Sequence, residues 1–365
     1  MIDEFSVKAV MTLTISSEPV PRHTTQSEEA AAVAAARGGD RDAFADLCER
    51  YRRQLHVHCY RMLGSVDDAD DLVQDTFLKA WQARGSFEGR SLFRTWLYRI
   101  ATNACLDVVA RRPKRVMPPD VRPPETTIGN GFPPPVELPW LQPYPDRLLD
   151  VAAPATEEPA VIVESRETIE LAYLAAIQHL PPRQRAVLIL RDALSWSARE
   201  TATLLDMSEA AANSLLQRAR ATMRTRLPER RSDWTRAKEI TPAERDLLRR
   251  YIAASEAADG AAFNALLADD VRQTMPPIPT WWDGKELVGA LNTFFLEGGA
   301  KGEFRAIPTA ANRQPAAAFY LRPYGETEFK LIAVDVLTMR DGLVTEMDTF
   351  DPHRSPGFDL PEVLD

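Results

Sequence analysis

The sequence has few cysteines and no long apolar run. Three cysteines in 365 residues are too few for the disulfide framework of a small secreted protein. Cys48 and Cys59 fall in one expected helix, about 16 Å apart along its axis at 1.5 Å per residue, which is beyond disulfide reach. No stretch of about eighteen apolar residues occurs, which argues against a membrane-spanning helix. Residues 1–27 lack a basic-then-apolar signal pattern and are expected to form a loose tail. We therefore expect a protein of the reducing cytoplasm.

A metal site is not expected, although His56, His58 and Cys59 lie close together in the sequence. Positions i and i+2 of a helix point to different faces, so these side chains do not converge on one ion. We interpret them as ordinary helix residues and expect neither a metal nor another cofactor.

The net charge of −9 is unevenly distributed. The acidic excess lies after residue 239, whereas residues 183–238 carry an excess of arginine and lysine. A local basic excess is the electrostatic footprint that phosphate binding requires. The acidic net charge therefore does not exclude DNA as a partner.

The chain is expected to be multidomain, with two all-α domains and a C-terminal α+β domain. The helical segments cover residues 28–116 and 166–230, and the C-terminal domain covers 242–365. Prolines crowd the intervening segment 117–165, which predicts a long irregular linker. Some apolar residues in the linker suggest that part of it docks on a surface: Trp140, Leu141, Tyr144, Leu148 and Leu149.

Helical periodicity is clear in the first segment. Apolar residues recur at three- and four-residue steps from Phe44 to Met62, Gly64 ends that helix, and Ser65 caps the next. In the helix that follows, one apolar stripe is expected to be buried: Val66, Ala69, Val73, Phe77, Ala80 and Trp81. Trp96, Ile100 and Ala104 are expected to mark the inner face of a third helix.

The strongest DNA signal is a helix-turn-helix pattern. Helices are expected over 198–205 and 209–226, with Asp206-Met207-Ser208 between them and Ser208 as an N-cap. The second helix would present side chains that can read base edges or grip phosphate: Asn213, Ser214, Gln217, Arg218 and Arg220. A solvated face of a helical hairpin is the alternative.

Basic and aromatic residues are interleaved around the third helix of the first segment. Such a pattern suits a groove for unpaired strand, where rings stack on bases and cations follow the backbone. Phe87, on a loop bounded by glycines, is the better candidate for contact with a base, whereas Trp96 is expected in the core.

The acidic helix after Ser65 has a second candidate surface. Acidic residues in a first helical turn need no partner because the helix dipole stabilises them. Asp75 lies beyond that turn, and Leu72 and Leu78 fall off the buried stripe. We therefore expect a protein-docking face here, formed by Asp71, Gln74, Asp75 and Phe77.

These residues carry a family resemblance. The stretch DADDLVQDTFLKAWQ, followed by FRTWLYRIATNACLD, closely resembles region 2 of the sigma-70 family. The stretch LPPRQRAVLILRDALSWSARETATLLDMSEAAANSLLQRARATM resembles region 4. Both have the form of the extracytoplasmic-function (ECF) group, which lacks the larger central domain, and the linker sits where that absence predicts.

The resemblance implies partners and roles. Core RNA polymerase would be bound through its clamp helices and flap, with Asp71, Gln74, Asp75 and Phe77 on the clamp helices of the largest subunit. The −35 element would be read by Asn213, Ser214, Gln217, Arg218 and Arg220. The −10 element would be melted with the help of Phe87, Arg90, Arg94, Trp96 and Asn103. Polymerase, not this chain, would perform the nucleotidyl transfer.

The C-terminal segment resembles the SnoaL-like, nuclear-transport-factor-2-like cone fold, with helices followed by strands over 316–321, 330–337 and 343–347. Trp281, Trp282 and Tyr320 are more often core residues than pocket lining in such a fold. That fold also hosts cyclases and isomerases, but His353 and Asp335 form no evident acid-base pair, so we expect no catalysis. We expect a regulatory domain whose pocket is a candidate site for a small-molecule ligand.

Two other functions stay open at this point. A helix-turn-helix regulator that is not a sigma factor would explain the basic segment but not the first 115 residues. A SnoaL-type cyclase or isomerase with a DNA-binding arm would turn over a small polyketide- or steroid-like compound.

Overall fold

A computed structural model describes residues 26–87, 92–128, 133–149, 169–227, 239–355 and 357–364. None of the helices in these ranges combines the length and apolarity needed to cross a bilayer. The chain divides into two compact units. One comprises residues 1–112, 149–168 and 179–232, and the other comprises 113–148, 169–178 and 233–365. The linker up to residue 148 therefore belongs to the unit that contains the C-terminal domain. Residues 169–178 belong to that unit as well.

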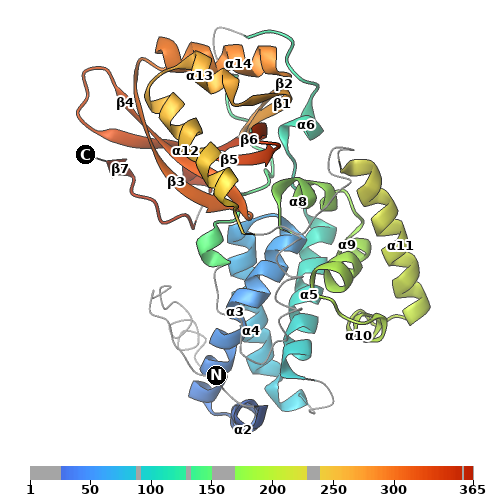
Figure 1. Ribbon diagram of the computed structural model, residues 1–365. Coiled ribbons are helices and arrows are strands. Elements are labelled where there is room, and N and C mark those ends of the chain that lie inside the picture. The colour runs from blue at the N-terminus through green and yellow to red at the C-terminus, as the bar shows by residue number, and fades with distance from the viewer. Residues whose placement is uncertain are drawn as a thin grey trace. The chain divides into compact units, whose positions relative to one another are not determined.

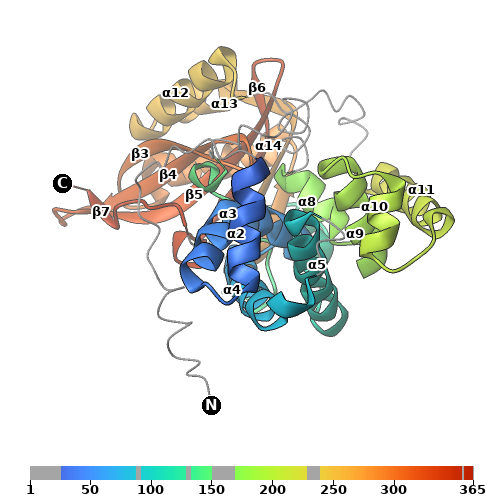
Figure 2. The same ribbon diagram turned by 90° about the horizontal axis from the view of Figure 1, so that it is seen from below.

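The first helical module contains α2 (Gln26–Arg37), α3 (Arg41–Leu63), α4 (Val66–Ala83) and α5 (Phe93–Arg111) (Figures 1 and 2). The stripe expected on α3 is confirmed, because Phe44, Leu47 and Leu55 are buried. Gly64 ends α3 in the left-handed conformation at φ 70°, and the Ser65 hydroxyl accepts from the Asp68 amide at 3.2 Å. Both predicted helix boundaries are therefore correct.

The second helical module contains α9 (Pro182–Leu188), a π-helical turn η3 (Ile189–Ala193), α10 (Ala198–Leu204) and α11 (Glu209–Arg226). Ser197 and Glu200 form a capping box at the start of α10. Ser208 caps α11 by accepting from the Ala211 amide at 3.1 Å, as predicted. Asp206 adopts φ 51° in the turn, a conformation that aspartate tolerates better than most residues. The helix-turn-helix is therefore present.

The two helical modules pack on each other within one unit. The buried guanidinium of Arg185, from α9, donates to the Met62 carbonyl at 2.6 Å and to the Leu180 carbonyl at 3.4 Å. Burial lowers the pKa of Arg185 to about 10, so the group is still charged at neutral pH. A second contact between the modules joins the rings of Tyr98, on α5, and Trp196, whose centroids lie 5.4 Å apart with the planes tilted by 53°. A cation with carbonyl oxygens as its acceptors therefore joins the modules.

The C-terminal module is a curved mixed sheet with helices on one face (Figure 1). The strand order is β2-β1-β6-β5-β4-β3, with β7 beside β5, and β1 pairs with β6 in parallel. The strands are β1 (Leu267–Met275), β2 (Ile278–Asp283), β3 (Gly302–Ala311), β4 (Gln314–Pro323), β5 (Phe329–Arg340), β6 (Leu343–Phe350) and β7 (Val363–Leu364). The helices are α12 (Pro242–Glu256), α13 (Gly260–Ala265) and α14 (Lys285–Phe294), the last followed by a π-helical turn η5 (Phe295–Gly299). The expected α+β class is correct, and the three expected strands correspond to β4, β5 and β6.

The linker lies against the C-terminal module instead of spanning solvent. The Glu125 amide donates to the Trp281 carbonyl at 2.9 Å, and the Trp281 indole donates to the Arg122 carbonyl at 2.8 Å. Farther along, the Val136 amide donates to the Pro277 carbonyl at 3.1 Å. The docking expected from the apolar residues is observed, because Trp140, Leu141 and Tyr144 are buried while Leu148 and Leu149 are half-buried. Among the described linker residues, two short helices interrupt the irregular path: α6 (Pro118–Val121) and η2 (Asp146–Leu148). A third, α8 (Leu171–Ile177), lies beyond the linker in the segment expected to be helical, and it belongs to the same unit as the C-terminal module.

Arg185→Ala is expected to lower the free energy of unfolding by about 3 kcal/mol, because it opens a cavity and leaves the Met62 carbonyl without its donor. Urea denaturation followed by circular dichroism measures this change. Arg183→Ala is the matched control, since Arg183 is exposed on the same helix, and should stay within about 0.5 kcal/mol of the wild type. Equal stability of the two variants would contradict the assigned role of Arg185.

Candidate nucleic-acid interface

The outer face of α11 presents all five predicted reading residues to solvent. Asn213, Ser214 and Gln217 are exposed, and so are Arg218 and Arg220. The opposite face packs inward through Ala212, Leu216 and Ala219. The polar residues therefore share one surface of a helix whose N-terminus is capped by Ser208, which is the arrangement needed to enter a major groove.

Arg220 differs from its neighbours because it is already paired. Its Nε and Nη2 donate to the Asp192 carboxylate at 3.0 and 2.6 Å, a bidentate pair between α11 and η3. This pair orients the guanidinium and holds α11 to η3, the π-helical turn that follows α9. Two of the Arg220 guanidinium nitrogens are thus already engaged by Asp192, and the pair fixes the position of α11 relative to η3.

The aromatic cluster near α5 differs from the prediction. Phe87 is buried, with its ring 5.7 Å from that of Phe93 and 5.2 Å from that of Trp96. Trp96 itself is only half-buried, and Ile100 is too. The inner face of α5 is formed instead by Phe93, Leu97 and, one turn farther along the helix, Ala101. The expectation that Phe87 is the exposed ring and Trp96 the core ring is therefore wrong for this structure, because the 84–87 turn folds Phe87 back onto α5.

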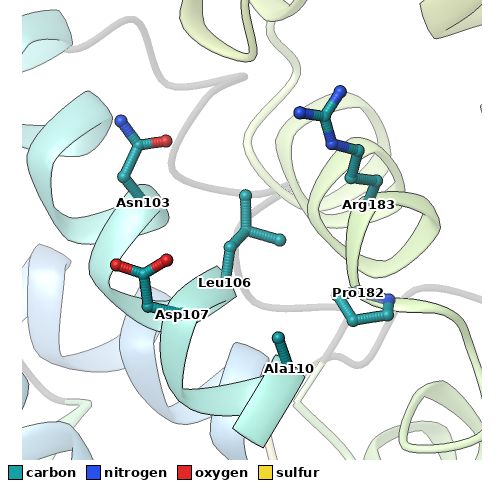
Figure 3. Close-up of a pocket in the computed structure, with 6 residues that line it drawn as sticks. All are labelled: Asn103, Leu106, Asp107, Ala110, Pro182 and Arg183. Atoms are coloured by element: carbon teal, nitrogen blue, oxygen red, sulfur yellow. The ribbon is translucent and has the colours of Figure 1, made fainter.

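The remaining candidates for strand melting lie on α5, except Arg90, which falls outside the described residues. The Arg94 guanidinium lies over the Tyr98 ring, 5.4 Å from its centroid. Asn103 is exposed and lines a pocket of about 300 Å³ with Asp107 and Arg183 (Figure 3). This pocket lies between α5 and α9, and its polar lining residues Asn103, Asp107 and Arg183 are exposed.

On α4 the acidic surface is present but smaller than expected. Asp71, Gln74 and Asp75 are exposed. Phe77 is fully buried, so its inclusion in the docking face is wrong. Leu72 is also buried, because the interior side of α4 is wider than a single stripe and faces both α3 and α5. The surface available to a partner is therefore polar and acidic.

The histidines and cysteines of the first module serve its core. The ring of His58 is buried beside Tyr98 and hydrogen-bonds with the Thr102 hydroxyl at 2.9 Å. Burial lowers its pKa to about 3, so the ring is neutral. Cys48, Cys59 and Cys105 are buried free thiols. Within the described ranges no group of three potential ligands gathers around a metal position.

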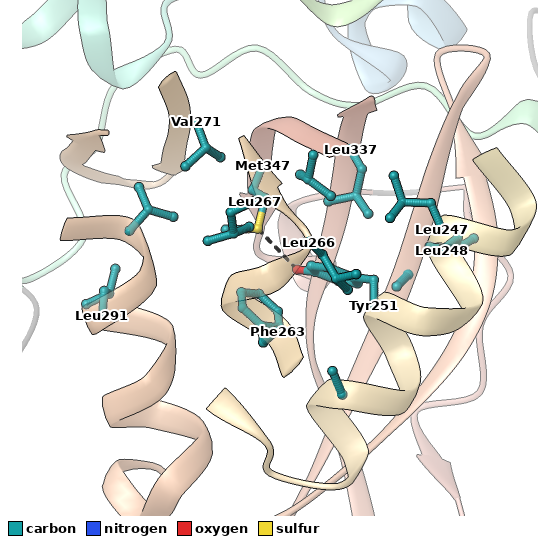
Figure 4. Packing of buried hydrophobic residues seen from close by; sticks show 14 of the residues in the cluster. Leu247, Leu248, Tyr251, Phe263, Leu266, Leu267, Val271, Leu291, Leu337 and Met347 are labelled. Carbon is teal, nitrogen blue, oxygen red and sulfur yellow. Dashed lines mark hydrogen bonds between the residues drawn. The ribbon is translucent and has the colours of Figure 1, made fainter. Parts of the chain in front are cut away.

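The C-terminal cone contains a buried polar pair that the sequence did not single out. The Tyr251 hydroxyl donates to Asp335 Oδ2 at 2.7 Å and lies 3.4 Å from the Met347 sulfur. Around it apolar side chains from α12, α13, α14 and the sheet fill the interior (Figure 4). Burial raises the pKa of Asp335, and Tyr251 opposes that rise through its hydrogen bond. The pair is thus a carboxyl group and a phenol within a packed core, and burial raises the pKa of both.

The aromatic residues considered as pocket lining have other partners. Trp282 belongs to the apolar cluster, whereas the Trp281 indole holds the linker at Arg122. The Tyr320 hydroxyl donates to the Pro361 carbonyl at 2.9 Å, and His353 is exposed. The expectation that these aromatics are structural is therefore confirmed for Trp282.

Sequence reasoning missed the residues that join distant segments. Arg185 and Asn312 are the main examples, since each hydrogen-bonds to residues more than 100 positions away. A run such as Asn312-Arg313 between two apolar segments is a turn signal, but its partners are not visible in the sequence.

Three family models match the chain. The Sigma-70 region 2 model matches residues 47–115, and the Sigma-70, region 4 model matches residues 170–223. A SnoaL-like domain model matches residues 248–347. The order of the three matches is the order of the three modules described above.

Individual relatives agree with these matches. The chain is 42% identical over 325 residues to the ECF RNA polymerase sigma factor SigG of Mycobacterium tuberculosis, covering 89% of this chain and 85% of the relative. It is 31% identical to the ECF RNA polymerase sigma factor SigW of Bacillus subtilis, over 52% of this chain and 91% of that one. The crystal structure of the Mycobacterium tuberculosis extracytoplasmic function sigma factor SigJ is similar in fold. Its TM-score is 0.52 and its identity 21%, over 86% of this chain and 99% of that one.

Asp335→Asn is expected to change the pH dependence of stability. The pKa of Asp335 is raised above 3.8 in the folded state, so the folded state retains a proton that the unfolded state has lost. Stability from this group is therefore complete below about pH 3.8 and falls as the pH rises through the folded pKa. The amide keeps an acceptor for Tyr251 but cannot ionise. The melting temperature of Asp335→Asn minus that of the wild type should thus rise with pH, and a pH-independent difference would refute this.

Proposed function

The chain belongs to the ECF sigma factors of RNA polymerase, which direct promoter-specific transcription initiation, and from this we propose which surfaces perform each step. The observation that carries the proposal is the presence of two exposed polar surfaces, the reading face of α11 and the acidic face of α4. Each lies on a helix whose other side is buried in a module core. One surface suits DNA and the other suits a protein.

The reading face of α11 contacts the −35 element in the major groove. Asn213 and Gln217 have amide groups that can pair with adenine edges, and Arg218 is positioned for guanine or phosphate. Arg220 acts mainly through Asp192, by fixing the angle at which α11 enters the groove.

The −10 element is opened at α5. Trp96 is the half-exposed ring of this helix and can stack on an unpaired base, while Arg94 and Asn103 supply polar contacts along the strand. Phe87 supports Trp96 from behind through ring packing.

Core polymerase docks on α4 through Asp71, Gln74 and Asp75. The partner surface is the pair of clamp helices on the largest polymerase subunit, and the second module contacts the flap. Phe77 contributes by keeping α4 packed, since its ring lies within the module with the Arg52 guanidinium 5.3 Å from its centroid.

The C-terminal module modulates these activities and does not catalyse a reaction. The whole chain acts in the cytoplasm, where polymerase works. Polymerase carries out the nucleotidyl transfer. A small-molecule ligand of this module would have to enter the apolar cluster of the cone, where Tyr251 and Asp335 are the polar contacts it would meet.

In vitro transcription with purified core polymerase tests the function directly. A sigma factor should select a promoter and start transcripts only with core enzyme present. Tight operator binding without polymerase would favour a helix-turn-helix regulator, and turnover of a small polyketide- or steroid-like compound would favour an enzyme.

Gln217→Ala and Arg218→Ala should separate base reading from phosphate binding. Losing the Gln217 amide should remove about 1–3 kcal/mol of discrimination at one −35 position. If Arg218 grips phosphate, Arg218→Ala should weaken all promoters alike and reduce the salt dependence by about one counterion. Holoenzyme binding to a set of −35 substitutions at several salt concentrations measures both effects. Arg249→Ala, an exposed arginine on α12, is the control and should change neither.

Asp71→Ala combined with Asp75→Ala should weaken core polymerase binding by roughly tenfold, because both carboxylates lie on the docking face and neither supports the fold. Titration of core enzyme with the fluorescently labelled chain measures this affinity. Asp46→Ala, an exposed acid on α3, should leave the affinity unchanged. A docking face elsewhere would be indicated if the double variant bound like the control.

A further inference from the structure

The pocket of about 300 Å³ between α5 and α9 lies wholly within the first unit (Figure 3). Its α5 wall is formed by positions 103, 106, 107 and 110, which share one face of the helix because they are three or four residues apart. Pro182 and Arg183 of α9 form the other wall. The pocket therefore brings side chains of both helical modules to one place.

Two opposite charges border this pocket without neutralising each other. The carboxylate of Asp107, on α5, and the guanidinium of Arg183, on α9, are both exposed. Among the described residues, neither side chain has a hydrogen bond or an ion pair, and the same is true of the Asn103 amide. A carboxylate, a carboxamide and a guanidinium are thus available to one ligand.

Asp107 and Asn103 lie one helical turn apart and together suit one edge of guanine. A carboxylate only accepts hydrogen bonds, so its two oxygens match two adjacent N–H donors. Guanine has such a pair, its ring N1–H and its exocyclic amino group, next to the O6 acceptor that the Asn103 amide can reach as a donor. Adenine has one amino donor beside a ring nitrogen that accepts, so a carboxylate is repelled by half of that edge.

The other lining residues suit the rest of a mononucleotide. Arg183 has the planar donor fork that binds phosphate bidentately. Leu106 lies between the polar residues of α5 and Arg183 in Figure 3, and with Ala110 and Pro182 it gives an apolar surface for a ring. A volume of about 300 Å³ is at the lower end of the range of small-ligand sites, which suits one nucleotide.

We propose that this pocket binds a guanine mononucleotide, with Asp107 and Asn103 on the base and Arg183 on the phosphate. Asn103 is also a residue that we assign to the −10 strand, so the nucleotide and that strand compete for α5. This second part rests on the proposed function. A guanine of the −10 strand itself has the same recognition chemistry, and the experiments below distinguish the two sources.

Isothermal titration calorimetry of the free full-length chain tests the site, with guanosine monophosphate, adenosine monophosphate and guanosine as probes. Guanosine monophosphate should bind at least about tenfold more tightly than adenosine monophosphate, because a bidentate pair distinguishes the two bases. It should also bind about tenfold more tightly than guanosine, which has no phosphate for Arg183.

Two variants separate recognition of the base from recognition of the phosphate. Asp107→Asn offers one donor and one acceptor, which matches the adenine edge, so this variant should bind adenosine monophosphate more tightly than guanosine monophosphate. Arg183→Ala should lower the affinity for guanosine monophosphate to that for guanosine and leave the latter unchanged. Asp46→Asn on α3 and Arg199→Ala on α10 replace exposed residues and are the matched controls, which should bind like the wild type.

Promoter opening by the holoenzyme tests the competition. A fluorescent base in the −10 element reports the rate of opening after preincubation with nucleotide. Guanosine monophosphate at ten times its dissociation constant should slow opening by about tenfold, because it occupies most of the pockets. The Asp107→Asn holoenzyme should respond to adenosine monophosphate instead. A response that persists in the Arg183→Ala holoenzyme would place the nucleotide on polymerase and overturn the competition.

The site is overturned if the free chain binds no guanosine monophosphate at about 1 mM, or binds both nucleotides equally. A free chain without affinity, together with a change from guanine to adenine preference at −10 in Asp107→Asn, would assign the pocket to the strand instead. Normal binding with an unchanged opening rate would overturn the competition. If the wild-type holoenzyme opens no promoter without nucleotide, the proposed function fails, while calorimetry on the free chain still decides whether the site exists.

Discussion

A proline-rich chain satisfies only part of its own backbone. Proline has no amide hydrogen, and residues preceding proline are biased away from helix. Val116 and Leu141 pair with each other within the linker, whereas other backbone groups of the linker need partners from elsewhere. The C-terminal module supplies them at Trp281, Pro277 and Asn312. For this reason the second unit is built from separate parts of the chain. Residues 113–148 of the linker form part of the same unit as the C-terminal module.

The same principle applies differently in the first unit. There the group that needs a partner is the Met62 carbonyl at the end of α3, and the donor is the Arg185 guanidinium from the second helical module. A buried cation without an opposite charge depends on its hydrogen bonds to offset the cost of desolvation. The contact between the modules therefore depends on the positions of the carbonyl groups that accept from Arg185.

Local patterns in the sequence predicted the helices and their ends well. Gly64, Ser65 and Ser208 act through neighbours within four residues, so their roles are visible without the fold. The inner and outer faces of α4 and α5 were less predictable. Periodicity placed Phe77 on the buried stripe of α4, as observed, and only its inclusion in the docking face was wrong. Phe87 is buried because of where a turn comes to lie, which periodicity along one helix does not reveal. The strands β1, β2 and β3 were not singled out, and the parallel pairing of β1 with β6 depends on tertiary context. The exposed face of α11 was predicted in full, because a capped amphipathic helix determines its own outer side.

The route of the chain through the two units has a consequence for biosynthesis. Domains generally fold as they leave the ribosome, N-terminal parts first. Both helical modules and the whole linker emerge before the β3–β4 turn has been translated, since Asn312 follows Tyr144 by 168 positions. A nascent chain, or one released early by a premature stop codon, thus presents its linker before the partners of that linker in the C-terminal module exist. Complete translation is what supplies these partners.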